Sequence, residues 1–541
     1  MREGFRQSMA WLHTWSGLLV GWVLFLVFAA GTASYFRDEI TVWMTPELHL
    51  TGLSVPAQPE VAQRAVTTLQ ALAPASPRWF IKLPTEREPG VRVTWLRPPP
   101  SPGDKPATGS RRFENASLDP GTGQVLAAAR DTHGGEFFYR LHFDLHYMPA
   151  VWARWLVGFC TMFMLVAIVS GIVTHKRIFA DFFTFRPKKG QRSWLDAHNA
   201  VAVLALPYHL MITYTGLITL MFMYMPWGPQ VAYKGDQTAF FAEVQPAVGP
   251  RDPKPAGKPA TLTPIAPLVV QASGHWGGAA VGRITVNNPN DAHATISLQR
   301  QEGRNMSSSQ SVMIFNGVNG ALLSTSGDSE GPAMQTRGVL YGLHLGRFAD
   351  PLLRALFFLC GLAGCVMVAT GLLLWSVKER QKYAKALAQG GRVGWGLRLV
   401  DGLNIGTVAG VPMAMAVYFW ANRLLPLNMA ERPQAEINSF FIAWGMATLA
   451  GLAWPKRRMW QVQLALGGAL FAGVPLLNVL TTATHLGVAI PAGLWAVAGF
   501  DLTCVGLGAA LLLCAWWLGR RSPARRTQGA ASARLAQEPA L

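Results

Sequence analysis

Residues 137–147 read FFYRLHFDLHY, and residues 341–346 echo the centre of that stretch as YGLHLG. In each copy a Leu-His pair is followed by a proline seven residues after the histidine, and then by an arginine within an otherwise apolar run. The equivalent residues are His142, Pro149 and Arg154 in the first copy and His344, Pro351 and Arg354 in the second. The spacing from histidine to proline is the same in both copies, and a motif that recurs in this way predicts an internal duplication.

The duplication extends to two further helices. His13 precedes Gly31 by 18 residues, and His198 precedes Gly216 by 18 residues. The repeating unit is therefore a helix, an outer segment and a second helix, present twice. Repeats of this kind commonly build one bundle around a shared site.

The composition is that of a membrane protein. Half of the 541 residues are hydrophobic and 14% are charged, whereas a soluble protein carries about 25% charged residues. A bilayer span needs ~20 consecutive apolar residues. Eight runs approach that length, at about 15–36, 149–174, 200–225, 351–376, 402–425, 438–454, 460–482 and 493–518. We therefore expect an all-α polytopic membrane protein with about eight transmembrane helices.

The net charge of +18 is concentrated in short segments at alternate ends of these runs. With eight spans, every basic segment falls on one side, which is the positive-inside pattern and places both termini in the cytoplasm. The charge therefore sets orientation and does not indicate nucleic-acid binding. We expect the first run to be an uncleaved anchor; a cleaved signal peptide is the alternative.

Two long segments, 37–148 and 226–337, interrupt the spans and are expected on the side away from the basic loops. Each contains a strand-turn-strand signal, ASLDPGTGQVL at 116–126 and VMIFNGVNGALL at 312–323. Asp-Pro-Gly and Asn-Gly turns between alternating apolar residues are typical of hairpins. We therefore expect two small α+β domains outside the membrane.

The first four spans are expected to form a four-helix bundle from the duplicated unit. In chain order, the predicted organisation is transmembrane helix 1 at 1–36, an outer domain at 37–148, transmembrane helices 2 and 3 at 149–225 with a basic cytoplasmic loop at 175–195, a second outer domain at 226–337, transmembrane helix 4 at 338–378, a basic cytoplasmic loop at 379–400, a C-terminal four-helix extension at 401–519 and a disordered cytoplasmic tail at 520–541.

The repeated histidines are the candidate functional residues. Ionisable side chains inside a membrane are rare, face the bundle interior and usually mark function. Haem iron takes two axial imidazoles, and a four-helix bundle can supply one from each of two helices. The repeat predicts one haem between His142 and His344 at the outer end and a second between His13 and His198 at the inner end. His209 lies about three turns after His198 and is a further candidate that could replace His198 or His13.

Two arginines and one metal alternative accompany this hypothesis. Arg154 and Arg354 could neutralise the propionates of the outer haem, or extend to the interface. Zinc would need four ligands with help from cysteine or carboxylate, and only Asp196 stands beside one of these histidines.

His146 follows His142 by four residues but has no counterpart in the second copy, where Phe348 stands. We therefore expect His146 to be a neighbour of the site rather than a ligand. Pro149 leaves the helical phase of this stretch open, so the two histidines could exchange roles.

Five motifs resemble the PepSY-associated transmembrane family over roughly residues 5–385: AWLHTWSGLL, YRLHFDL, SGIVTHKRIFADFFTFRPKKGQRSWLDAHN, LPYHLMITYTGLI and YGLHLGRF. That family includes iron-regulated inner-membrane proteins of Gram-negative bacteria. Some members, the FoxB-type ferric-siderophore reductases, carry two b-type haems in a four-helix bundle with PepSY-like periplasmic domains. On matching positions the resemblance implies His13, His142, His198 and His344 as haem ligands, with His209 as a further candidate. The extra helices at 400–518 depart from the short members.

The expected function is therefore an oxidoreductase of the bacterial inner membrane. Electrons would cross two b-type haems and reduce a ferric siderophore in the periplasm. The chain contains no flavin or NAD motif, so the donor would be external, either a quinol or a cytoplasmic reductase. The alternatives are a siderophore or iron transporter and a membrane-anchored periplasmic binding or regulatory protein.

Overall fold

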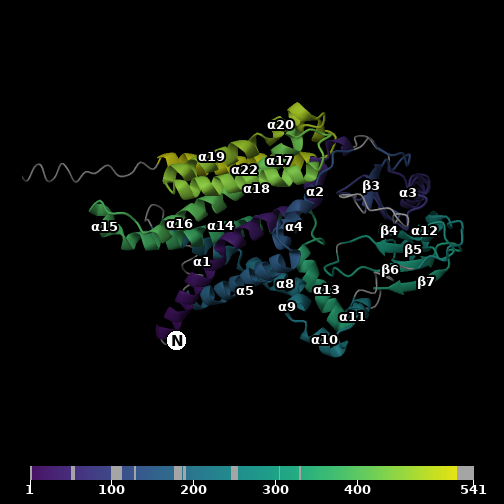
Figure 1. The fold of residues 1–541 in the computed structure, drawn as a ribbon, viewed down its shortest axis with the longest axis horizontal. Coiled ribbons are helices and arrows are strands. Elements are labelled where there is room, and N and C mark those ends of the chain that lie inside the picture. Colours follow the sequence, from purple (N-terminus) through teal and green to yellow (C-terminus); the bar gives the residue numbers. More distant parts are fainter. Residues whose placement is uncertain are drawn as a thin grey trace, which may run out of the picture. The chain divides into compact units, whose positions relative to one another are not determined.

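A computed structural model of the protein describes residues 3–49, 55–98, 113–126, 129–175, 186, 191–244, 254–303, 305–327 and 331–520 (Figure 1). The chain divides into two compact units. The first comprises Met1–Trp375, Pro426–Pro433 and Thr482–Phe500, and the second comprises Ser376–Leu425, Gln434–Thr481 and Asp501–Leu541. Most of the basic loop predicted at 175–195 and almost all of the tail predicted at 520–541 lie outside the described residues.

The described part of the chain contains six helices that are long and apolar enough to cross a membrane, or seven if one bent pair counts as a span. The six are Gly4–Ser34, Ala150–Thr174, Pro351–Lys382, Trp395–Leu424, Arg457–Thr481 and Trp495–Arg520. The bent pair is α7 (Gln191–Leu204) and α8 (Leu206–Thr219), which turn by 68°. Pro207 near the start of α8 explains the break, because proline cannot continue a helix from the preceding turn.

The predicted count of eight spans is therefore not confirmed. The run predicted at 438–454 does form a helix, α18 (Arg432–Ala453), but α18 is not among the candidate spans. Its first turns carry Arg432, Glu436 and Asn438, which dilute its apolar character.

The repeated motif lies on short helices rather than on the spanning helices. His142 belongs to α4 (Glu136–Asp144) and His344 to α13 (Pro332–Leu345). The spanning helix α5 (Ala150–Thr174) begins directly after Pro149, and α14 (Pro351–Lys382) begins at Pro351. Proline suits a first helical turn because its missing N–H would have no helical partner there. The sequence-based placement of both histidines at the ends of spans is corrected accordingly.

Helix α1 (Glu3–Ser34) is the central element of the first unit's helices. It packs along α5 and α4, and α8 contacts both α5 and α13. Small residues allow α14 to approach α1 closely: a Cβ on Gly361 would lie against Thr32, and one on Gly364 would lie against Phe28. Close helix approach at small residues is typical of packing inside a bilayer.

The two segments expected to form separate outer domains build one seven-stranded sheet. Its order is β3-β2-β1-β4-β5-β6-β7, and all neighbouring strands are antiparallel. The strands are β1 (Arg78–Lys82), β2 (Val91–Leu96), β3 (Phe113–Leu118), β4 (Val281–Asn287), β5 (Thr295–Arg300), β6 (Val312–Asn316) and β7 (Leu322–Ser326). The first three come from the first segment and the last four from the second. The predicted hairpin at 312–323 is confirmed as β6 and β7.

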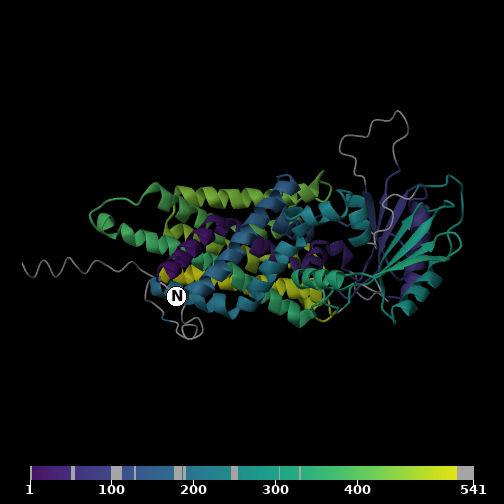
Figure 2. The ribbon, with the colours of Figure 1, turned by 90° about the horizontal axis from the view of Figure 1, so that it is seen from below.

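The sheet has one covered face. Helices α3 (Gln58–Leu72) and α12 (Ile265–His275) contact each other and pack on the strands (Figure 2). Alternate strand residues such as Trp79, Ile81, Ile284 and Val286 are fully buried beneath them. The expectation of two separate domains is corrected, because β1 and β4 pair at the centre of a single sheet over one shared core.

The second unit is a helical bundle. After the end of α14 it contains α15 (Ala384–Ala388), α16 (Trp395–Asn404), a π-helical turn η3 (Ile405–Ala409), α17 (Gly410–Leu424), α18, α19 (Arg457–Ala472), α20 (Val474–Thr481) and most of α22 (Trp495–Arg520). A buried polar network crosses it. Arg423 donates to Asn478 at 3.1 Å, and Asn478 donates to Asp501 at 3.0 Å. Buried polar groups in a membrane bundle are normally paired in this way.

Candidate functional site

Two histidines from the repeated motif meet between helices of the first unit. The rings of His142 and His344 lie 6.0 Å apart between centroids and are tilted by 35°. They come from α4 and α13, and both line the same cavity as residues of the sheet. We call them the sheet-side pair.

Hydrogen bonds orient both rings of the sheet-side pair. The Nδ1 atom of His142 lies 2.7 Å from the carbonyl oxygen of Val27, and Nδ1 of His344 lies 3.2 Å from the Thr215 hydroxyl. A carbonyl only accepts, so His142 must donate from Nδ1, which leaves its Nε2 lone pair free. Metal-binding histidines are characteristically held by such a bond on the other ring nitrogen.

A second pair has the same construction. The rings of His13 in α1 and His198 in α7 lie 6.3 Å apart, and we call them the far pair. Nδ1 of His13 lies 2.8 Å from the Ala167 carbonyl oxygen, and Nδ1 of His198 lies 3.0 Å from that of Met367. The four histidines that the sequence paired are therefore brought together in the predicted pairs.

Each of these four rings faces a glycine on a neighbouring helix. A Cβ built on the glycine would lie 2.6 Å from His142 at Gly31, 3.0 Å from His344 at Gly216, 3.1 Å from His13 at Gly171 and 3.4 Å from His198 at Gly371. The sequence showed Gly31 and Gly216 only as spacing markers. Their role as gaps for the imidazoles emerges from the packing.

The two pairs are separated along α1. His142 contacts α1 at Val27 and Gly31, whereas His13 lies 14 to 18 residues earlier. At 1.5 Å per residue this corresponds to about 21–27 Å along the helix. The hydrocarbon core of a bilayer is about 30 Å thick, so the two pairs span most of that depth.

The spacing within each pair fits haem iron. Because a histidine nitrogen lies about 2 Å from its metal and the ring centre lies about 1 Å further, two imidazoles on one iron have centroids roughly 6 Å apart. The described residues contain no cluster of three or more His, Cys, Asp or Glu that could hold a bare metal ion. A group that needs only two protein ligands and apolar walls therefore fits these sites.

His209, the fifth candidate, belongs to neither pair. It is 1% exposed, and neither ring nitrogen has a hydrogen-bond partner among the described residues. Its ring packs edge-on against Phe28 at 6.0 Å and beside Tyr208 at 5.9 Å. Aromatic packing is thus its observed environment.

The two candidate arginines line the cavity, and each already has an acidic partner. Arg154 pairs with Asp144 at 2.7 Å, and Arg354 pairs with Glu39 at 3.2 Å. Both arginines therefore point toward the region beside the sheet-side pair with their charge largely compensated.

The cavity beside the sheet-side pair has a volume of about 880 Å³. One wall is formed by α1, α8 and the two histidines, and another by the ends of β1, β4 and β5. Asp38 of α2 (Arg37–Met44) also lines it. Burial opposes ionisation of that carboxyl, but three cations, Arg87 at 3.1 Å, Lys82 and Arg37, together outweigh burial and lower the pKa of Asp38. Pockets for small ligands usually have volumes of about 300–1,000 Å³.

His146 lies outside this cavity lining. Leu145, His146 and Tyr147 have φ values of +53°, +53° and +40°, so three consecutive non-glycine residues adopt a left-handed turn. Burial, together with the neighbouring His133, lowers the pKa of His146. This turn ends α4 immediately after the segment that carries His142.

Three features were not predicted from the sequence. They are the glycines Gly171 and Gly371, the Tyr35–Tyr208 hydroxyl contact at 2.9 Å in the cavity lining, and the basic residues that β4 and β5 bring to the cavity. The two glycines were the easiest of these features to find from the sequence, because a search for further repeated spacings would have aligned them.

The fold defines a polytopic membrane protein with two facing pairs of partly buried histidines in its first 375 residues. Residues 10–378 match the family model described as PepSY-associated TM region, and the chain belongs to that family. It is also 25% identical over 382 residues to an uncharacterized protein of Pseudomonas aeruginosa, an alignment that covers 68% of this chain and 91% of that protein. The family match ends near the start of the second unit.

Proposed function

We propose that the chain is a haem-containing electron-transfer protein of the bacterial inner membrane that reduces ferric iron held by a siderophore in the periplasm, as FoxB-type members of the family do. The observation that supports it most is the pair of bis-histidine sites, each with ring centroids about 6 Å apart, separated along α1. Haem b bound at these sites would supply one-electron transfer.

The residues of the chain would hold and separate the two groups. Backbone carbonyls of Val27, Ala167 and Met367 orient three of the four imidazoles, which keeps each ligand nitrogen directed into the site. The glycines leave room beside the rings. The cavity beside His142 and His344 gives a ferric chelate access to the sheet-side pair.

The overall reaction balances with a quinol as donor. One quinol supplies two electrons, so two ferric chelates become ferrous, and one quinone and two protons are released. A cytoplasmic reductase is the alternative donor. Reduction favours release because Fe(II) binds hard oxygen chelators less tightly and exchanges ligands faster.

Orientation follows from charge. The positive-inside pattern of the sequence supports an orientation with the far pair toward the cytoplasm and the sheet toward the periplasm.

Absorption spectroscopy of the purified full-length protein tests the proposal. Reduced-minus-oxidised spectra should show b-type haem at about two groups per chain. The dithionite-reduced protein, freed of reductant, should then convert a ferric siderophore to Fe(II) that a ferrous chelator traps. A colourless protein would refute the haem assignment, and a haem protein that yields no Fe(II) would refute the reductase assignment.

A further inference from the structure

The basic residues lining the cavity fall into two groups. Near the histidines, Arg37, Arg154, Arg347 and Arg354 each pair with a carboxylate. On the sheet wall the arginines of β4 and β5, Arg283 and Arg300, form no ion pair and no side-chain hydrogen bond within the described ranges. The unpaired positive charge of the cavity therefore lies on the sheet wall.

Strand register places Arg283 beside another cation. Lys82 of β1 is its direct cross-strand partner. Side chains at such positions lie about 5 Å apart, and like charges there are destabilising unless compensated. Glu88 forms an ion pair with Lys82, so the charge of Lys82 is compensated and that of Arg283 is not. On the other side Arg283 faces Gln299 of β5, whose amide can donate further hydrogen bonds.

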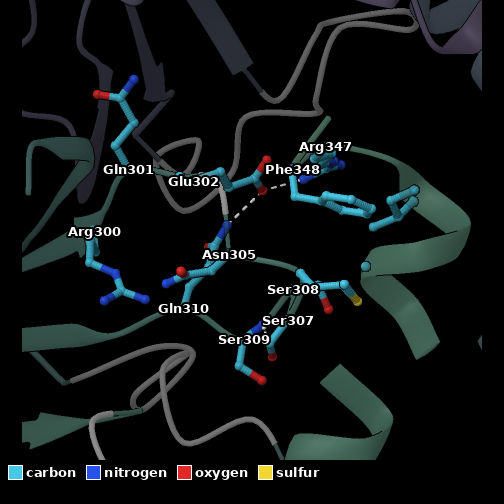
Figure 3. A pocket seen from close by; sticks show the side chains of 14 residues that line it. Arg300, Gln301, Glu302, Asn305, Ser307, Ser308, Ser309, Gln310, Arg347 and Phe348 are labelled. Carbon is cyan, nitrogen blue, oxygen red and sulfur yellow. Dashed lines mark hydrogen bonds and ion pairs between the residues drawn. The ribbon is translucent and has the colours of Figure 1, made fainter. Parts of the chain in front are cut away.

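Glu302, two residues after Arg300 in the chain, is engaged by other side chains. Figure 3 shows Glu302 joined by dashed lines to Arg347 and Gln310, while none leads to Arg300. Arg347 follows the α13 helix that carries His344, so this ion pair ties the β5–β6 segment to the site. The guanidinium of Arg300 is left for an external partner.

The remaining acids of the cavity do not cancel these charges locally. Asp350 accepts from the Leu353 N–H at 2.8 Å and caps the start of α14. Glu86 lies exposed on the β1–β2 connection. Neither forms an ion pair with Arg283 or Arg300 among the described residues.

We propose that the sheet wall, through Arg283, Arg300 and Gln299, binds the carboxylate groups of an anionic ferric chelate. This rests on the proposed function and specifies its substrate class. Guanidinium forks bind carboxylates through two parallel hydrogen bonds, which recognise geometry as well as charge. The cavity holds such a chelate with its carboxylates toward the sheet and its metal toward the histidines.

Redox-inert gallium(III) citrate tests recognition separately from electron transfer. Its binding to the full-length protein is measured by isothermal titration calorimetry, with a neutral gallium trihydroxamate as the comparison ligand. We expect the citrate complex to bind at least tenfold more tightly. Arg283→Glu and Arg300→Glu should each weaken its binding by about tenfold or more, and the neutral ligand should be unaffected.

Arg92→Glu is the matched control, because Arg92 lies on β2 of the same sheet but does not line the cavity. It should leave both affinities unchanged. Equal affinity for the two gallium ligands, or equal losses in the control and the two variants, would overturn the proposal.

Haem content and Fe(II) trapping from ferric citrate distinguish the possible failures. Retained haem with a raised KM for ferric citrate in Arg283→Glu supports the assignment. Loss of haem in that variant would show that these arginines hold propionates instead, and would overturn it. Gallium citrate binding by a wild-type protein that lacks haem would leave the recognition site standing and refute the reductase.

Discussion

The sheet-side pair and the far pair share one construction but differ in their surroundings. In both, two imidazoles face each other at about 6 Å, with Nδ1 atoms held by oxygen atoms and rings set against glycine. Only the sheet-side histidines are among the lining residues of the 880 Å³ cavity, which also contains charged side chains. The two pairs therefore share the arrangement of their imidazoles but differ in the cavity and the charged side chains beside them.

Removing one of the four paired histidines should have the largest effect, the loss of one haem. His142→Ala and His344→Ala should each abolish the same haem, and His13→Ala and His198→Ala should abolish the other, because one iron needs both axial imidazoles. Haem content per chain and the reduced-minus-oxidised spectrum measure this, falling from about two haems to about one. If His142→Ala and His344→Ala remove different haems, the pairing is wrong.

Adding a methyl group beside each ring should give a graded version of that effect. We expect the loss of haem affinity to follow the closeness of contact, largest for Gly31→Ala, then Gly216→Ala and Gly171→Ala, and smallest for Gly371→Ala. Overpacking of this kind costs roughly 1–3 kcal/mol.

Gly17→Ala is the matched control for that series, since it lies in the same helix as Gly31 with no atom within 4 Å of a new Cβ. It should keep both haems and raise helix stability slightly, because alanine is the better helix former by about 1 kcal/mol. Equal haem loss in the control would show that the glycines serve helix flexibility and not ligand space.

Freeing a guanidinium from its ion pair should shift the midpoint potential of one haem and leave that of the other unchanged. Asp144→Asn frees Arg154 beside the sheet-side pair, and added positive charge favours the reduced haem. A half-buried charge is worth about 1 kcal/mol or less, so we expect that haem's midpoint potential to rise by roughly 20–40 mV, since 59 mV corresponds to 1.4 kcal/mol for one electron. Redox titration should show the far-pair haem unchanged. An equal shift at both sites would contradict the separation of the two environments.

His209 belongs to neither pair and tests whether haem binding is confined to the paired histidines. His209→Phe should retain both haems, since it replaces a buried imidazole lacking hydrogen-bond partners in the described structure with an apolar ring among Phe28 and Tyr208. Removing an unsatisfied buried polar group is neutral or stabilising. Loss of either haem band would make His209 a ligand after all.

The smallest expected effect lies away from both pairs. Arg130 donates to Glu47 at 2.9 Å. Burial opposes ionisation of Glu47, but this bond, the charge of Arg130 and backbone hydrogen bonds together lower the pKa of Glu47. Its stabilising contribution is therefore complete above the ordinary value of about 4.5 and is lost as the pH falls through the lower folded-state pKa. Glu47→Gln should lower the melting temperature slightly at pH 7, corresponding to about 1 kcal/mol or less.

Circular dichroism melts of the wild type and Glu47→Gln at pH 7, 5 and 3.5 check this expectation. The difference should shrink below pH 4.5, while haem content stays equal in both proteins. A difference that is independent of pH would mean that Glu47 contributes by packing and not by charge.

The sequence predicted the histidine pairs but not the helices that carry them. The pairing of His142 with His344, and of His13 with His198, followed from equal spacing in a repeat, and the structure brings both pairs together. Their position on separate short helices did not, because Pro149 and Pro351 begin new helices and spacing alone cannot show where a helix breaks. The predicted count of eight spans is not confirmed, because α18 starts with polar residues and is not among the candidate spans of the described chain.

The sheet was the largest miss in the fold. The β6–β7 hairpin is local and was predicted from its turn residues, whereas the stretch at 116–126 forms only an isolated bridge between Leu118 and Val125. The β1–β4 pairing joins Ile81 to Ile284 across a long stretch of chain that includes α5. The basic residues of the sheet wall were not predicted for the same reason, since Lys82 and Arg283 become neighbours only through the β1–β4 pairing.

The shared sheet also constrains how the protein can be made. Strand β1 is synthesised about 200 residues before its central partner β4, and the intervening chain must be inserted into the membrane first. During that interval β1 and β2 expose an unpaired edge and half of an apolar core, a state prone to aggregation. The segment with β4–β7 therefore completes the sheet that β1–β3 begin, and we expect that neither segment would form this sheet if expressed without the other.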